Sequence, residues 1–261
     1  MKKRGQVSVL IIVAIMVIVA VAVYLSLSNQ SSTNNLRSAL SKIGISQQVN
    51  VLENSIGECL KTTLDDAIGV IGIQGGFYTR PEASEDLGIT FIPYYYDQGS
   101  FLQPSLNKIE SEISDFVNEF LPFCIEDIVI EDILLKQESI KTITKINPGE
   151  VEIQSDMQIT LSKGDQTTLI ELTSYPTRLN SKLNEMYEIS EYIIDSHRGD
   201  PEFICINCMA DMAEEKGLFV DMLSFEVPFT TLFIISEDTD STDPKILEFL
   251  NKYPESETPI E

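Results

Sequence analysis

An apolar run close to the amino terminus limits what this chain can fold into more than any other feature of its sequence. Between Val7 and Leu27, the only polar side chains among 21 residues are two serines and one tyrosine. As a helix with a rise of about 1.5 Å per residue, the run would be about 31 Å long, which matches the hydrocarbon core of a bilayer. It predicts a single transmembrane helix over residues 6–28, with the lipid bilayer as its partner through residues 7–27.

The charges beside this segment predict its orientation. Lys2, Lys3 and Arg4 precede it, whereas the polar residues Asn29 and Gln30 follow it and carry no charge. Positively charged flanks tend to stay on the cytoplasmic side of a membrane. We therefore expect a protein of the cell membrane, with its amino terminus in the cytoplasm and its carboxy-terminal body outside the cell.

These features leave three fates open for the segment. A cleaved secretory signal has an apolar core of about 7–15 residues, shorter than this run, although Ser26-Leu27-Ser28 offers small residues for a cut. A plain signal-anchor would keep the whole segment. In the third fate, a peptidase removes only the basic leader, residues 1–5, and the helix remains in the membrane.

The third fate is favoured by a resemblance. The junction KKRGQVSVLIIVAI resembles the class III signal peptide of archaeal type IV pilin-like proteins. The resemblance implies that a prepilin-type peptidase cuts between Gly5 and Gln6, and Gln6 followed by Ser8 fits the start that this family favours. Many pilins carry a glutamate where this chain has Leu10, which implies a minor or non-filamentous role.

Segments of the body resemble a second family. ECLKTTLDDAIGVIGIQGGFY, IPYYYDQGSFLQPSL and VNEFLPFC are similar to an uncharacterised family of membrane-anchored archaeal proteins that carry the same kind of leader. This resemblance implies the same topology for the present chain. It implies no activity.

Hydrophobic spacing in the first half of the body predicts helices and short strands. Apolar residues recur every three or four positions from Val49 to Val70, which is typical of one face of a helix. The expected elements are a helix over 46–72, strands over 77–80 and 89–96, and a helix over 106–121 that Pro122 ends. A polar linker over 29–45 separates them from the membrane segment.

The second half opens with the clearest strand in the chain. From Val151 to Leu161, apolar and polar residues alternate, and turn sequences lie on both sides, so residues 139–175 predict a three-stranded meander with one wet face. The elements expected after it are a helix that includes 179–194, a helix over 201–216 that begins at Asp200-Pro201, and strands over 218–223 and 229–235. The predicted fold class is α+β, with a transmembrane helix followed by an ectodomain of mainly antiparallel sheet packed by several helices.

The charge of the body excludes one class of partner. The residues after Gly5 contain 15 of the 18 Lys and Arg residues and all 41 Asp and Glu residues, so they carry a formal charge of −26. Phosphate backbones repel such a surface. We expect no binding of nucleic acid.

Four cysteines are candidates for two disulfides outside the cytoplasm. Cys59 lies on the apolar stripe of the helix 46–72, and Cys124 follows the end of the helix 106–121, so a bridge between these two helices is expected. Cys205 and Cys208 then remain for each other, either as a strained bridge or as two free thiols, because side chains three residues apart on a regular helix lie too far apart for an easy bond.

The Cys205-Ile206-Asn207-Cys208 motif also suggests an alternative function. A C-x-x-C pair at the start of a helix can act as a redox centre, because the helix dipole stabilises a thiolate. In the predicted helix 201–216, Cys205 lies more than one turn from the start, which argues against this chemistry. The single histidine, His197, excludes zinc sites with two or three histidines, and we expect no catalytic residue, metal or cofactor.

Taken with the topology, these features predict a single-pass, membrane-anchored, pilin-like cell-surface protein with a structural or interaction role rather than an enzyme. Its partners would be the prepilin-type peptidase and components of the envelope or pilus. The extracytoplasmic α+β domain is expected over residues 46–253, and a disordered tail over 254–261. The alternative is an extracytoplasmic enzyme, a thiol oxidoreductase that uses Cys205 and Cys208.

Overall fold

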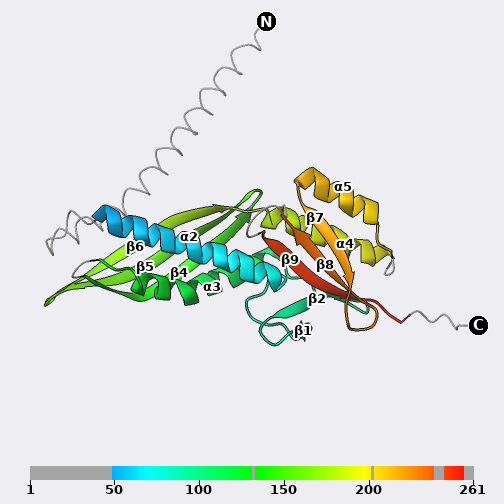
Figure 1. Cartoon of the computed structure of the whole chain (residues 1–261), viewed down its shortest axis with the longest axis horizontal. Helices are drawn as coiled ribbons and strands as arrows, with labels where there is room; N and C mark the ends of the chain where they lie inside the picture. Colours follow the sequence, from blue (N-terminus) through cyan, green and yellow to red (C-terminus); the bar gives the residue numbers. More distant parts are fainter. Residues whose placement is uncertain (1–48, 131–132, 201–202, 238–243, 256–261) are drawn as a thin grey trace, which may run out of the picture. The chain divides into compact units, whose positions relative to one another are not determined.

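The computed structural model describes residues 49–130, 133–200, 203–237 and 244–255 (Figure 1). The leader, the predicted membrane helix, the linker and the last part of the predicted tail lie outside these ranges. Among the helices that are described, none combines the length and the apolar character needed to cross a membrane. The predicted anchor belongs to the part of the chain that is not described.

The described residues form an α+β fold with four helices and mainly antiparallel sheets. The helices are α2 Val49–Ile73, α3 Leu106–Glu126, α4 Leu183–Gly199 and α5 Ile206–Lys216. The strands are β1 Ser84–Asp86, β2 Phe91–Asp97, β3 Ser100–Phe101, β4 Leu134–Asn147, β5 Glu150–Lys163, β6 Gln166–Asn180, β7 Phe219–Ser224, β8 Thr230–Ser236 and β9 Ile246–Lys252. The predicted α+β class is confirmed at this level.

The chain divides into two compact units, each assembled from separate stretches of sequence. The first unit includes residues 49–56, 125–140 and 155–176. Its part of β5 alternates as predicted, since Met157, Ile159 and Leu161 are buried while the residues between them are more exposed. The predicted three-stranded meander is confirmed, with strand order β4-β5-β6 and two-residue turns that make neighbouring strands antiparallel.

The second unit, which includes residues 57–124, 141–154 and 177–255, contains the larger sheet. Its strand order is β1-β2-β9-β8-β7, and the short β3 pairs with β2. The strand β9 runs parallel to β2 and antiparallel to β8. The last described strand of the chain therefore lies in the middle of this sheet, and β7 lies at its edge.

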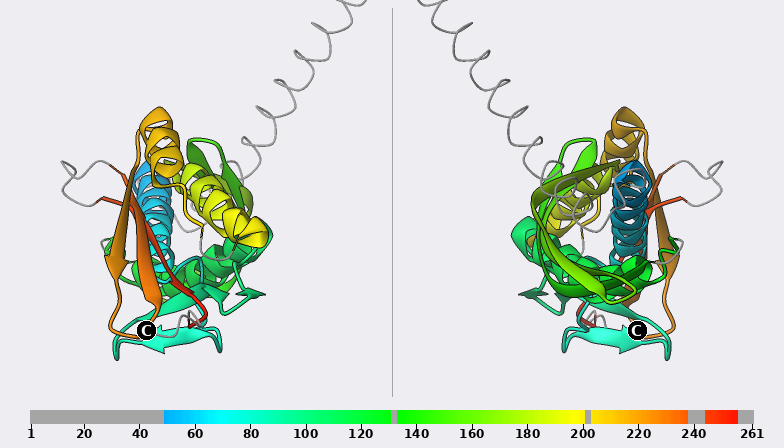
Figure 2. Two further views of the ribbon diagram at one scale, coloured as in Figure 1. Left: turned by 90° about the vertical axis from the view of Figure 1, so that its right-hand side faces the viewer. Right: turned by 90° about the vertical axis from the view of Figure 1, so that its left-hand side faces the viewer.

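Helices cover one face of this larger sheet. Both α4 and α5 lie on the same side of it (Figure 2), and their apolar residues share a core with β2, β8 and β9. Phe233 and Phe249 are fully buried there with stacked rings 5.2 Å apart. On the opposite face, a smaller cluster is built around Ile92, Tyr94 and Leu250.

Two glycines fix the end of α2 in the second unit. A Cβ added at Gly72 would lie 2.1 Å from the backbone oxygen of Ile246, so only a glycine lets the helix come this near to β9. Gly75, in the turn that follows, has a φ of +53°. The predicted end of the helix, at residue 72, is confirmed within one residue.

The strand predicted over residues 77–80 is wrong. These residues form a loop whose backbone is held by a buried carboxylate on α3 instead of by a neighbouring strand. Glu112 accepts hydrogen bonds from the N–H groups of Tyr78 at 2.7 Å and Thr79 at 2.8 Å, and it also pairs with Lys108. A side chain thus satisfies the backbone donors that a strand would have given to a ladder.

The end predicted for the second helix is also wrong, because α3 continues through Pro122 to Glu126. The fully buried Leu121 lies directly before the proline, and Cys124 in the next turn is bonded to Cys59 on α2. The burial of Leu121 before Pro122 and the disulfide of Cys124 after it stabilise the helix on the two sides of the proline. They offset the stability lost with the helix hydrogen bond that the proline removes.

Candidate functional site: a disulfide and an apolar groove beside an edge strand

The helix α5 begins later than predicted, and this changes the position of the C-x-x-C motif. The expected start at Asp200-Pro201 is wrong, since the helix begins at Ile206 and Asp200 instead follows the end of α4. Cys205 is the N-cap residue, and its Sγ accepts a hydrogen bond from the N–H of Cys208 at 3.3 Å. The sulfur takes the place of the oxygen that a serine or aspartate cap would supply.

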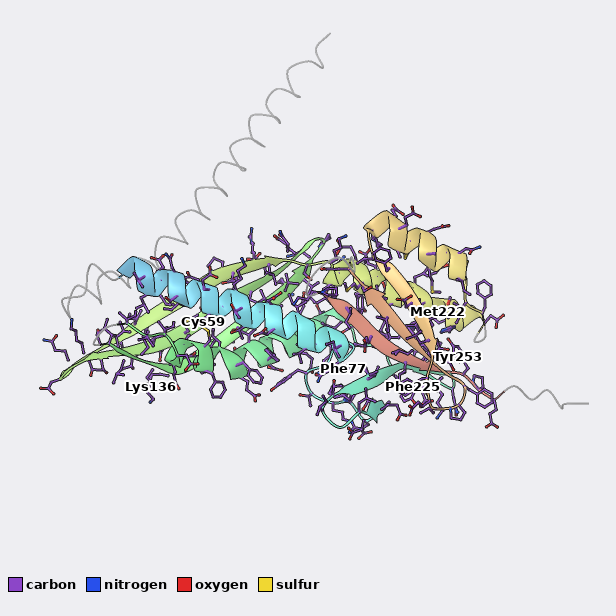
Figure 3. The ribbon with its side chains drawn as sticks, viewed as in Figure 1. Cys59, Phe77, Lys136, Met222, Phe225 and Tyr253 are labelled. Atoms are coloured by element: carbon purple, nitrogen blue, oxygen red, sulfur yellow. A yellow bond between two sulfur atoms is a disulfide. The ribbon has the colours of Figure 1, made fainter. Side chains whose placement is uncertain are left out.

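All four cysteines lie in the described residues and are paired in two disulfides. Cys59 is bonded to Cys124, with 5.7 Å between their Cα atoms and 65 residues between them in sequence (Figure 3 labels Cys59 on α2). Cys205 is bonded to Cys208, with 5.2 Å between Cα atoms. As the cap residue, Cys205 has a non-helical backbone with φ −82° and ψ 86°, so its side chain does not take the direction that a residue within a regular helix would have.

The Cys205–Cys208 disulfide is accessible to other molecules. Cys208 is exposed and Cys205 is half-buried. The side chains of Phe203 and Ile206, on either side of Cys205, are 53% and 63% exposed. If the bond is reduced, the first turn of α5 places its unpaired N–H groups and its positive dipole end beside the Cys205 sulfur, which stabilises a thiolate.

A groove runs between α5 and β7, next to this disulfide. One hollow, of about 260 Å³, is lined by Ile206, Met209, Ala210, Val220 and Met222. A second hollow of about 610 Å³ shares Ala210 and Val220 with the first and continues toward the end of α5. We call the two hollows together the α5–β7 groove.

The acidic side chains of the groove are not neutralised. Glu214 and Asp221 line the second hollow, and neither has an ion pair with another of the described residues. The two nearby lysines are already occupied. Lys216 lies 2.5 Å from Glu188 on α4 and holds the pKa of that carboxyl below its usual range, and Lys182 donates to the backbone oxygens that end α5.

A buried polar cluster surrounds His197 at the end of α4. The imidazole is 1% exposed, and the Nδ2 of Asn251 donates to its Nε2 at 3.0 Å. The hydroxyl of Tyr253, which Figure 3 labels just beyond β9, lies 3.4 Å from the same nitrogen. Burial lowers the pKa of His197, and its lack of exposure keeps it out of reach of a substrate.

Two further buried carboxylates have structural partners. Glu112 holds the loop that follows α2, as described above. Glu110 accepts from the N–H of Ile146 at 3.1 Å and from Nζ of Lys145 at 2.8 Å. With their oxygens bonded in this way, neither is free to act as a general base.

Sequence reasoning named all four cysteines but missed the groove and the cluster around His197. The groove joins residues of α5 and β7, and the cluster joins α4 to β9, so neither forms a motif in sequence. Within the described residues, no group of three or more His, Cys, Asp or Glu side chains is arranged to hold a metal ion. Comparisons with protein-family models, with curated proteins and with solved structures find no match to this chain.

Proposed function

We propose that this chain is a single-pass, membrane-anchored, pilin-like protein of the cell surface, whose body outside the cell has a structural or interaction role. The observation that carries the proposal is the apolar run from Val7 to Leu27 behind the cations Lys2, Lys3 and Arg4. Its length matches a bilayer and its charges orient the body outward. The class III signal that the junction resembles adds cleavage by a prepilin-type peptidase and retention of the helix.

The disulfides support a body outside the cytoplasm. Structural disulfides persist in oxidising compartments and are rare in the cytosol. The 6% exposure of Cys59 shields its bond to Cys124 from reductants, as is typical of a structural bridge. The role in interaction is supported by the α5–β7 groove, because an exposed apolar hollow lined by several large side chains is typical of a binding surface.

Two measurements test the proposed topology. Mass spectrometry of the protein from its own membrane should find an amino terminus at Gln6, with the apolar segment retained. A protease added to intact cells should remove the body. A mature start at Asn29, or a body that the protease reaches only after lysis, would overturn the proposal.

Leu10 limits the form of assembly. Many pilins have a glutamate at this position, and its charge can pair with the new amino terminus of a neighbouring subunit. An unpaired charge in lipid is costly, so a helix without this partner packs less well in a filament core. We therefore propose a minor or non-filamentous role among envelope or pilus components, and purified pili composed chiefly of this chain would contradict it.

One observation favours the alternative function, a thiol oxidoreductase. Cys205 caps α5 instead of lying inside it, so the sequence-based argument against redox chemistry no longer holds. In such a reaction, the Cys205 thiolate would attack a substrate disulfide, Cys208 would then displace the mixed disulfide, and two electrons would pass to the substrate, which leaves as two thiols.

Thiol titration discriminates between the two functions. After mild reduction of the full-length protein, the alkylation rate of Cys205 should be measured against pH. An oxidoreductase requires a thiol with a pKa well below the usual value of about 8.5. The interaction role predicts that the Cys205→Ser variant still interacts with envelope or pilus components. Loss of that interaction together with a low thiol pKa would favour the enzyme.

A further inference from the structure

The outer edge of β7 is open. This strand ends the sheet order β1-β2-β9-β8-β7 and pairs along its whole length with β8 alone. Its residues from Phe219 to Ser224 pair in register with those of β8 from Ser236 to Thr231. Among the described residues, none pairs with the other side of β7, so this side presents unpaired backbone groups.

The hydrogen-bond pattern identifies which backbone groups face outward. In the same register, the N–H of Phe225 donates to the oxygen of Thr230 at 3.0 Å. Residues of an antiparallel strand alternate between bonding their neighbour and pointing away from it. Leu223 and Asp221 therefore bond β8, whereas the N–H and C=O groups of Met222 and Val220 point out from the edge.

The side chains of the same two residues line the α5–β7 groove. Val220 and Met222 form its apolar wall on the strand, opposite Ile206 and Met209 of α5. Figure 3 labels Met222 on β7. A strand added along this edge would place every second side chain toward the groove. Its backbone would bond the outward N–H and C=O groups of β7, and those side chains would contact the apolar wall of the groove.

The charge at the edge selects the kind of segment. Glu214 and Asp221 line the second hollow without an ion pair among the described residues, while the nearby lysines are occupied. The residues after Gly5, with 15 basic and 41 acidic side chains, would repel a second copy of this chain. An approaching segment with basic side chains would be attracted.

We propose that β7 binds an extended segment of another protein, with alternating basic and apolar residues, by adding it to the sheet as a new edge strand. This mode of recognition takes affinity from backbone hydrogen bonds and specificity from alternate side chains. The site deepens the interaction role proposed above and rests on it. It requires no chemistry at the adjacent disulfide.

The test uses the full-length protein in lipid nanodiscs and a defined probe. The probe is a fluorescent, end-capped synthetic peptide of alternating lysine and valine, seven residues long, whose binding is followed by fluorescence anisotropy. The variant Met222→Pro removes one outward N–H without disturbing a bond to β8, and Pro is tolerated at such edge positions. The matched control Met222→Ala shortens the same side chain and keeps the N–H.

We expect Met222→Pro to weaken binding of the lysine–valine peptide by roughly tenfold or more, and Met222→Ala by only about threefold. The double variant Glu214→Gln/Asp221→Asn should weaken it several-fold, and added salt should reduce that difference. A second probe protects the test against misfolding of the proline variant. The same peptide with all of its backbone amides N-methylated has no N–H to donate to β7 on either edge and should not bind the unaltered protein.

Several results would overturn the proposal. They are no binding of the lysine–valine peptide, equal binding by Met222→Pro and Met222→Ala, equal binding of a glutamate–valine peptide, or self-association of the chain through β7 that excludes the peptide. The outcome is independent of the topology test. A peptide that binds as expected while the mature protein begins at Asn29 would retain the β7 site and overturn the proposed anchoring.

Discussion

Cys205 has two roles at the start of α5. Its Sγ forms a covalent bond with Cys208 and also accepts the N–H of Cys208, so one atom closes the disulfide and caps the helix. A cap contributes about 1 kcal/mol to stability. The two contributions can be separated by substitution, because serine replaces only one of them.

The first prediction compares two double variants that both lack this disulfide. Cys205→Ser/Cys208→Ala keeps an oxygen that can cap α5, whereas Cys205→Ala/Cys208→Ala does not. We expect the serine variant to have the higher free energy of unfolding, by about 1 kcal/mol. Urea denaturation measures the difference, and equal stabilities would show that the cap contributes nothing.

The second prediction concerns His197. Its burial lowers its pKa from the usual value of 6.5, so the unfolded chain binds the proton more readily than the folded protein. The free energy of unfolding should therefore be highest above pH 6.5 and fall as the pH drops from 6.5 toward the lower pKa of the folded state.

The variant His197→Gln provides the reference for this measurement. Glutamine can still accept from Asn251 but does not titrate, so it should lack this decrease. Glu248, whose pKa is raised by burial, acts in the opposite direction, and it is present in both proteins and cancels in the difference. Unfolding followed from pH 5 to 8 tests the effect, and a histidine protein that gains stability relative to the variant on acidification would contradict it.

At the scale of elements, a covalent bond joins α2 and α3. The Cys59–Cys124 bridge closes a loop of 65 residues, and on the chain-entropy model such a loop stabilises the folded state by roughly 4 kcal/mol. The bridge also lies in the last turns of α3, beyond Pro122, where the helix has lost one hydrogen bond.

The third prediction follows from the length of that loop. We expect Cys59→Ala/Cys124→Ala to lower the free energy of unfolding by about 4 kcal/mol. The loss should exceed that of Cys205→Ala/Cys208→Ala, because the Cys205–Cys208 bridge spans only three residues. Denaturation in parallel measures both losses. Peptide mapping without reductant should recover the Cys59–Cys124 peptide, and a bridge from either residue to Cys205 or Cys208 would contradict the packing of the two helices.

Elements with a strong local pattern could be predicted from the sequence. The alternation from Val151 to Leu161 gave β5 its correct buried face, and the spacing of apolar residues located the end of α2 within one residue. Both signals are local, since each records which side of one element is buried.

The errors occurred where distant residues decide the local structure. Residues 77–80 are a loop because Glu112, on another helix, bonds their N–H groups. The start of α5 is set by a cap that sequence rules do not expect of cysteine. The α5–β7 groove could not be predicted because it depends on which strand lies at the edge of the sheet, and this follows from β9 entering between β2 and β8.

At the scale of the whole chain, β9 joins the strands β1 to β3 of the larger sheet to β7 and β8. It is the last described strand, yet it pairs with β2 on one side and β8 on the other. Its side chains Leu247, Phe249 and Leu250 are fully buried. Without β9, two strand edges and much of the core of this unit would be exposed to water.

The fourth prediction is that this unit requires its last strand to fold. A chain ending at Glu237 should show no cooperative unfolding of the second unit and should be digested rapidly by protease. A chain ending at Glu255 should match the full-length protein in both measurements, because it retains β9. A cooperative transition of the second unit in the shorter chain would refute this role of β9.

The central position of β9 also determines when the larger sheet can be completed during synthesis of the chain. About 155 residues separate the end of β2 from the end of β9, and at about 5–20 residues per second their synthesis takes roughly 8–30 s. During that interval, β2 is already made while its central partner is not, and its bare edge is available to strands of other nascent chains. Ribosome pausing before β9 would lengthen this vulnerable period, so crowding of nascent chains should lower the yield of this protein more than that of one whose sheet closes in sequence order.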